Sequence, residues 1–287
     1  MSTKGPIGVF DSGYGGLTVL KEITALLPEY DYLYLGDNAR APYGPRSFDT
    51  VYHYTLQCVK WFFNQGCSLV ILACNTASAK ALRTIQQSDL PVIAPGKRVL
   101  GVIRPTTERI GELTKSGKVG ILGTKGTVKS ESYLIEIKKM YPQLEVFQEA
   151  CPMWVPLIEN GEYENEGADY FIAKNLNNLL SQSGEIDTVL LACTHYPLIK
   201  DKIGKLLNDT VRVISQGSIV AESLADYLVR HPEIEAKCSR GGTAVFRTTD
   251  SNEDFDYHAT TFFGRPVISQ HVSLEQEVPA KADDAGI

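Results

Sequence analysis

The sequence predicts an α/β protein made of two similar doubly wound parallel-sheet domains, with a functional site in the cleft between them. Apolar runs that are typical of buried strands alternate with helical patterns almost throughout the chain. Two stretches also echo each other, VILACNT at 70–76 and VLLACTH at 189–195, as do IGVFDSG at 7–13 and VGILGTK at 119–125. Repetition at this spacing suits two domains of the same design rather than a solenoid.

The first domain is expected to contain strands at 7–10, 32–35 and 69–73, which are short apolar runs followed by aspartate, glycine and cysteine respectively. Helical patterns occupy 16–27, 47–65 and 77–87. A fourth strand is expected at 91–93, where Pro-Val-Ile follows the third helical pattern.

The second domain repeats this alternation, with strands at 119–122, 145–147, 189–192 and 211–214 and helices at 129–140, 168–180 and 219–229. The segments around 95–96 and 104–105 are expected to carry the crossover between the domains, and 208–210 the return. The predicted domains are therefore residues 1–98 with 210–274, and residues 99–209. Residues 275–287 have little to bury and are expected to form a flexible tail.

Composition excludes several classes of protein. The 287 residues are 43% hydrophobic and 22% charged, which is typical of a globular protein. A net charge of −6 provides no broad basic surface, so neither nucleic acid nor a membrane is an expected partner. With no signal-like leader and no apolar run long enough for a membrane span, a cytoplasmic location is expected, where the six cysteines stay reduced.

Cys74 and Cys193 are the strongest functional candidates, because each ends an equivalent apolar strand and precedes an expected helix start. The carboxyl ends of parallel strands are where open α/β sheets bind ligands. A helix N-terminus lowers the pKa of a thiol toward neutrality, so either side chain could act as a thiolate base. Two thiols presented alike by two domains could face one small molecule from opposite sides. The alternative is that each is a small buried apolar residue.

Three further features accompany the thiols. The turn DSGYGG at 11–16 offers backbone N–H groups to an anion but departs from the dinucleotide fingerprint, so a carboxylate site is favoured over a nucleotide site. His195 could protonate a substrate or orient a thiol, and it lacks the neighbours of a zinc site. The loop APYG at 41–44 could close over a ligand or be a plain surface turn.

These residues resemble the glutamate racemases of the cofactor-independent aspartate/glutamate racemase superfamily. The resemblance rests on FDSGYGGLTV at 10–19, DNARAPYG at 37–44, ACNTASA at 73–79, CPMWVPLIE at 151–159 and CTHYPL at 193–198. It implies interconversion of L- and D-glutamate, which supplies D-glutamate for peptidoglycan, without pyridoxal phosphate or metal. A homodimer is a further expectation from the resemblance.

The resemblance also implies roles for individual residues. Cys74 is expected to be the base that acts on D-glutamate, assisted by Asp11. Cys193 is expected to act on L-glutamate, assisted by His195 and Glu159. Groups expected to bind the substrate are Asp11, Ser12, Tyr43, Gly44, Asn75, Thr76, Thr194 and His195.

The chain departs from the family pattern at 94–100, where an apparent insertion lengthens the join after the third strand. Two other functions stay open at this point. One is an aspartate racemase of the same superfamily, which would differ in pocket length. The other is a non-catalytic amino-acid-binding protein, which would explain two domains but not the paired thiols.

Overall fold

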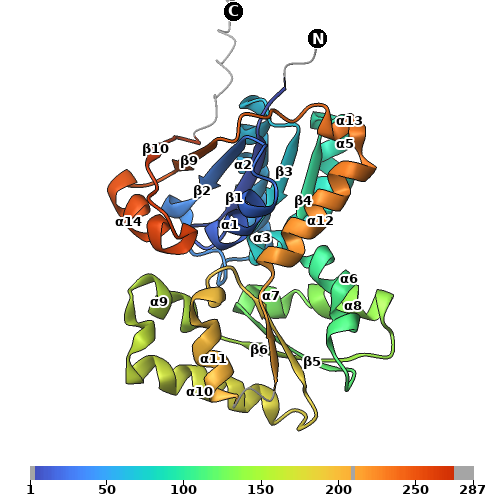
Figure 1. Cartoon of the computed structure of the whole chain (residues 1–287), viewed down its shortest axis with the longest axis vertical. Coiled ribbons are helices and arrows are strands. Elements are labelled where there is room, and N and C mark those ends of the chain that lie inside the picture. Colours follow the sequence, from blue (N-terminus) through green and yellow to red (C-terminus); the bar gives the residue numbers. More distant parts are fainter. Residues whose placement is uncertain (1–3, 208–210, 275–287) are drawn as a thin grey trace, which may run out of the picture.

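The computed structural model describes residues 4–207 and 211–274. Figure 1 shows two stacked α/β units, the larger one containing both the first and the last described strands. The larger sheet has the strand order β10-β9-β2-β1-β3-β4 and the smaller one β6-β5-β7-β8. All pairings between named strands in the described ranges are parallel. The predicted fold class, two doubly wound parallel-sheet units, is confirmed.

The bounds of the elements are as follows. The strands are β1 (Ile7–Asp11), β2 (Tyr32–Gly36), β3 (Leu69–Leu72), β4 (Arg98–Gly101), β5 (Lys118–Gly123), β6 (Glu145–Ala150), β7 (Thr188–Ala192), β8 (Arg212–Ile214), β9 (Ala244–Thr248) and β10 (Ser269–His271). The α-helices are α1 (Leu17–Leu26), α2 (Phe48–Asn64), α3 (Asn75–Lys80), α4 (Leu82–Thr84), α5 (Leu90–Ile93), α6 (Ile103–Leu113), α7 (Lys125–Lys129), α8 (Ser132–Met140), α9 (Trp154–Glu159), α10 (Glu166–Leu180), α11 (Lys200–Leu206), α12 (Gly217–Arg230), α13 (Pro232–Glu235) and α14 (Asn252–Phe263). Short 3₁₀ turns are η1 (Asn38–Arg40), η3 (Glu162–Glu164) and η4 (Tyr196–Ile199), and η2 (Ile85–Asp89) is a π-helical turn.

The two sheets share one strand order. The order β2-β1-β3-β4 in the larger sheet matches β6-β5-β7-β8 in the smaller one, so β3 and β7 are equivalent strands. Cys74 and Cys193 follow these two strands and therefore lie at equivalent positions, at the carboxyl ends of β3 and β7. This is the structural basis of the echo between 70–76 and 189–195.

Helices cover both faces of each sheet because side chains alternate along a strand. In β1, Ile7 and Val9 pack with α1, α12 and α14, whereas Phe10 packs on the other face with α2. In the smaller sheet, Val119 and Ile121 face α6 and α8, and Leu122 faces the cluster that includes α9 and α10. The carboxyl ends of the strands are thus supported by buried side chains on both faces of each sheet.

The strand expected at 91–93 is wrong. These residues form α5, which continues the helical run through α4 and η2, and the fourth strand is β4 at Arg98–Gly101. Pro91 stands in the first turn of α5, directly after the π-helical turn η2. The apparent insertion at 94–100 therefore consists of a turn and most of β4.

Two domain boundaries also differ from the sequence-based expectation. The β4 strand pairs with β3 in the larger sheet, and β8 pairs with β7 in the smaller one. We propose boundaries close to residues 102 and 215 instead of 98 and 210. Arg104 and Pro105, expected in the crossover, lie within α6. The expected return at 208–210 and the tail at 275–287 lie outside the described residues.

Residues beyond 230 form elements that were not predicted from the sequence. The β9 strand extends the larger sheet beside β2, and β10 lies beside β9. Between them, α14 packs against α1. In the ranges that the structure describes, no helix is long and apolar enough to cross a membrane.

Candidate active site

The turn after β1 and the loop after β7 lie directly against each other. The Thr194 hydroxyl donates to Asp11 Oδ1 at 3.4 Å, and the Thr18 hydroxyl donates to the Thr194 carbonyl at 2.9 Å. A Cβ atom placed on Gly15 would lie 2.3 Å from Thr194 Oγ1 and 2.4 Å from His195 Nδ1. Glycine at this position therefore permits the close approach of the two units.

Cys74 is the residue that caps α3, and its sulfur is buried. The Ala77 N–H donates to Cys74 Sγ at 3.5 Å, and the Ser12 hydroxyl lies 3.5 Å from the same atom. Burial nevertheless raises the pKa of this thiol to about 12, assisted by the nearby charges of Asp11 and, to a smaller degree, Cys193. The expectation of a pKa lowered toward neutrality is wrong here, because the two hydrogen bonds and the short helix do not offset the loss of hydration.

Cys193 lies beside a histidine and a carboxylate. His195 Nδ1 is 3.9 Å from Cys193 Sγ, and His195 Nε2 is 2.8 Å from Glu159 Oε1 at the end of α9. Burial alone would lower the pKa of His195, but hydrogen bonds and charges from Cys193 and Glu159 raise it to about 10. His195 is therefore an imidazolium at neutral pH, placed to hydrogen-bond to the sulfur. The helix expected directly after Cys193 is instead the 3₁₀ turn η4, which begins at Tyr196.

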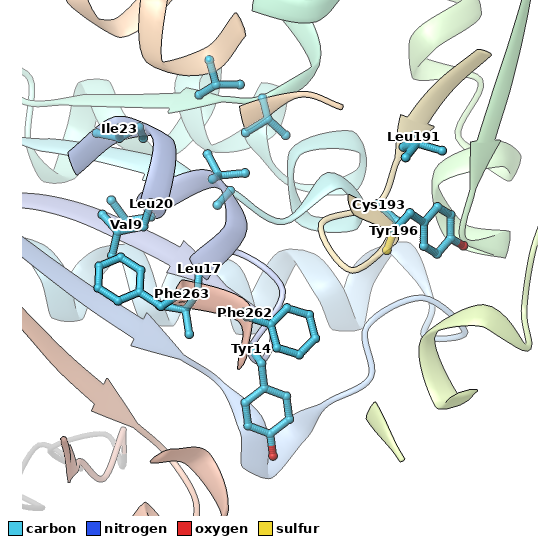
Figure 2. Packing of buried hydrophobic residues seen from close by; sticks show 14 of the residues in the cluster. Val9, Tyr14, Leu17, Leu20, Ile23, Leu191, Cys193, Tyr196, Phe262 and Phe263 are labelled. Carbon is cyan, nitrogen blue, oxygen red and sulfur yellow. The ribbon is translucent and has the colours of Figure 1, made fainter. Parts of the chain in front are cut away.

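A residue from α14 fixes the plane of this imidazole. The Phe262 ring meets His195 edge-on at 5.1 Å between centroids and stacks with Tyr14 at 6.2 Å. Tyr14 in turn donates to Asp254 Oδ2 at 2.6 Å. Figure 2 shows the Tyr14 and Phe262 rings together and Cys193 beside Tyr196 on the opposite loop. Thus α14 supports both the turn after β1 and the loop after β7.

Asp11 is fully enclosed between the two units. Its Oδ2 atom is buried and has no hydrogen-bond partner among the described residues. Burial raises the pKa of Asp11 to about 6, against the lowering effects of the His195 charge and of hydrogen bonds from Gly16 and Thr194. Such a carboxyl group exchanges its proton near neutral pH, which suits a site that moves protons.

Asn75 and Thr76 begin α3 and point toward the second unit. The Asn75 amide contacts Gln216 and Tyr133, and the Thr76 hydroxyl lies 3.0 Å from Thr124 Oγ1. Thr124 caps α7 at the end of β5, a position equivalent to Ser12 after β1. The similarity between 7–13 and 119–125 aligns Thr124 with Ser12, so it could have identified Thr124 from the sequence.

Side-chain hydrogen bonds and the burial of Tyr43 hold the loop at 41–44 in place. Tyr43 is 1% exposed, and its hydroxyl donates to Asp37. The Lys80 ammonium group donates to the Arg46 carbonyl at 2.5 Å, which ties this loop to α3. The Tyr43 side chain is therefore packed inside the protein, and the roles of Tyr43 and Gly44 in substrate binding stay predictions.

The structure thus brings together Asp11, Ser12, Asn75, Thr76, Glu159, Thr194 and His195 around the two thiols. Among the contacting residues that had no assigned role in the sequence analysis are Thr124, Tyr133, Gln216 and Phe262. Gln216 and Phe262 lie in segments that carry none of the glycine or cysteine patterns that mark a site. No group of three His, Cys, Asp or Glu side chains within 4–207 and 211–274 forms a candidate metal centre.

Comparison with known proteins finds a matching family, similar sequences and similar solved structures. Residues 7–224 match the model of the Asp/Glu/Hydantoin racemase family. The chain is 40% identical over 273 residues to a glutamate racemase of Geobacter metallireducens, covering 94% of this chain and 97% of that protein. Crystal structures similar to it include a glutamate racemase of Bacillus anthracis, with TM-score 0.85, 33% identity and coverage of 94% and 98%. Another is that of Francisella tularensis in complex with D-glutamate, with TM-score 0.83, 31% identity and coverage of 95% and 98%.

Proposed function

Because this chain belongs to the Asp/Glu/hydantoin racemase family, we propose that it interconverts L- and D-glutamate by proton transfer at the α-carbon. The single observation that carries the proposal is the pair of thiols that follow the equivalent strands β3 and β7 of two sheets with the same order. Their environments meet through the contact between Asp11 and Thr194. Relatives named glutamate racemase cover almost the whole chain, which supports glutamate as the substrate.

The reaction requires one thiolate and one thiol on opposite faces of the substrate. In the L-to-D direction, the Cys193 thiolate takes the α-proton, and the C–H electron pair stays on the α-carbon and is delocalised into the adjacent carboxylate. The Cys74 thiol then donates its proton to the other face and becomes a thiolate. The two protonation states are exchanged at the end, so the protein is ready for the reverse reaction.

The different surroundings of the two sulfurs support this assignment. Cys74, with a pKa of about 12, is a neutral thiol at physiological pH and can serve as the proton donor. Cys193 faces the His195 imidazolium, whose positive charge suits a neighbouring thiolate. Asp11 assists on the Cys74 side, and Glu159 holds His195 on the other side.

We propose that the substrate is held by hydroxyl, amide and backbone groups. These are the side chains of Ser12, Asn75, Thr76 and Thr194 and the backbone of Tyr43 and Gly44. Donors aimed at the carboxylate would stabilise the charge that develops when the α-proton leaves, which is often the largest catalytic contribution. In the cell, we propose that a homodimer in the cytoplasm supplies D-glutamate for peptidoglycan.

Incubation with L-glutamate in deuterated water tests the proposal. We expect decay of the optical signal together with deuterium at the α-carbon. Both should be lost in Cys74→Ala and Cys193→Ala and kept in Cys238→Ala, which removes another buried cysteine. An amino-acid-binding protein would show neither exchange nor decay, and faster turnover of aspartate would indicate an aspartate racemase. Full turnover without either thiol would refute the two-base mechanism.

A further inference from the structure

Three side chains form a closed ring of hydrogen bonds directly behind Asn75. The Asn75 amide donates from Nδ2 to Gln216 Oε1 at 2.7 Å. Gln216 donates from Nε2 to the Tyr133 hydroxyl at 2.7 Å. The Tyr133 hydroxyl donates to Asn75 Oδ1 at 2.5 Å, which completes the ring.

The Val102 carbonyl, which can only accept, lies 3.2 Å from Gln216 Nε2 and thereby fixes the direction of the ring. If the Asn75 amide were flipped, its NH₂ group would face Tyr133 and its carbonyl oxygen would face the carbonyl oxygen of Gln216. The residues are buried, with exposures of 2% for Asn75 and 4% for Gln216, so water does not replace a lost partner. An unsatisfied buried amide is costly, and the ring therefore fixes one orientation of the Asn75 side chain.

This orientation leaves the second N–H of the Asn75 amide for a ligand. Asn75 directly follows Cys74 at the start of α3, which places its amide among the groups around the thiols. The amide is thus a fixed donor rather than one that must be reoriented when a substrate arrives, and such preorganisation reduces the cost of binding.

Gln216 also connects the two units. Besides the ring, the second N–H of its Nε2 is shared between Thr106 Oγ1 at 2.9 Å and the Val102 carbonyl at 3.2 Å. Thr106 lies on α6 and Tyr133 on α8, and both helices pack on the smaller sheet. Asn75, by contrast, begins a helix that follows β3 of the larger sheet. The ring is complete only when the two units are packed as in this structure.

We propose that Gln216 is a positioning residue that fixes the Asn75 amide for substrate binding and makes that orientation depend on the packing of the two units. The inference rests on the proposed function insofar as Asn75 binds the substrate. Gln216 itself touches neither thiol, and its influence passes through Asn75.

The kinetic test uses Gln216→Met, which keeps the length of the side chain but cannot donate or accept as the amide does. We expect kcat/KM to fall about tenfold, or about 1.4 kcal/mol, mainly through a higher KM for glutamate. Combining it with Asn75→Ala should add little to the loss caused by Asn75→Ala alone. Independent, additive losses would overturn the proposal, because they would show that Gln216 does not act through Asn75.

Thr106→Val is the matched control. It removes another partner of Gln216 without touching Asn75, so we expect lower thermal stability with kcat/KM within about twofold of the unmodified protein. Tyr133→Phe removes a single hydroxyl from the ring and should weaken glutamate binding in the same direction as Gln216→Met. A loss in Thr106→Val as large as in Gln216→Met would indicate a merely structural role and would overturn the proposal.

A second measurement does not depend on racemase activity. Side-chain amide NMR signals of Asn75, assigned by their disappearance in Asn75→Asp, should exchange slowly with solvent in the unmodified protein and in Thr106→Val. In Gln216→Met they should shift and exchange faster. Unchanged signals would overturn the positioning role. Absence of glutamate turnover in the unmodified protein would instead overturn the proposed function, while the amide signals would still decide the inference.

Discussion

Gly15→Ala provides a test of how closely the two units must approach. The added methyl group would lie 2.3 Å from Thr194 Oγ1 and 2.4 Å from His195 Nδ1, whereas ordinary contacts begin near 3.4 Å. Neither neighbour is the mobile end of a long side chain, because Thr194 is hydrogen-bonded to Asp11 and His195 is hydrogen-bonded to Glu159. One side must therefore retreat by about 1 Å.

A displacement of this size near reacting groups costs roughly 100-fold in rate, or about 2.7 kcal/mol of activation free energy. We expect kcat/KM for glutamate, followed by circular dichroism, to fall by about this factor while the protein stays folded. Gly184→Ala is the control, because a methyl group there meets no atom within 4 Å. A folded Gly15→Ala variant with the activity of the control would refute the argument.

Three other predictions concern protonation. In Glu159→Gln, the loss of charge should lower the pKa of His195 from about 10, so the alkaline limb of the kcat/KM pH profile should move to lower pH; an unmoved limb would contradict this. Burial is the chief cause that raises the pKa of Asp11 from 3.8 to about 6. The contribution of Asp11 to the free energy of unfolding is therefore greatest below about pH 4, and about 3 kcal/mol of this contribution is lost as the pH rises through 6. Asp11→Asn should therefore become more stable relative to the unmodified protein over that interval in urea unfolding, and a constant difference would count against the burial argument. Because the pKa of Cys74 is about 12, its alkylation by iodoacetamide, mapped by mass spectrometry, should keep rising beyond about pH 10, and a plateau near neutrality would show a thiolate instead.

Much of the architecture around the thiols was predictable from local sequence. The strands before Cys74 and Cys193 are uninterrupted apolar runs buried on both faces, and such runs are the clearest signal of a parallel sheet. The repeated order of strands accounts for the repeated sequence patterns. The contact of Glu159 with His195 was expected only from the resemblance, because no local pattern connects a residue at the end of α9 with the loop after β7.

The wrong predictions have physical causes that a sequence does not display. Residues 91–93 form a short apolar run, and such a run fits a buried strand or a helix equally well. The pKa of Cys74 depends on how completely the folded chain buries the thiol, which is a property of tertiary packing.

The α14 helix did leave signals in the sequence. Ser251 caps its first turn by accepting from the Asp254 N–H, and Gly264 ends it with φ of +80°. Both are ordinary helix boundaries, but nothing in them indicates that the helix reaches the site.

The position of α14 has a consequence for protein engineering. The helix is encoded far downstream of both thiols, yet its Phe262 packs against His195 and its Asp254 accepts a hydrogen bond from Tyr14. A chimera that joins the N-terminal part of this chain to the C-terminal segment of a relative would place a different side chain against His195. Such hybrids offer a way to retune catalysis while every group that meets the substrate stays the same.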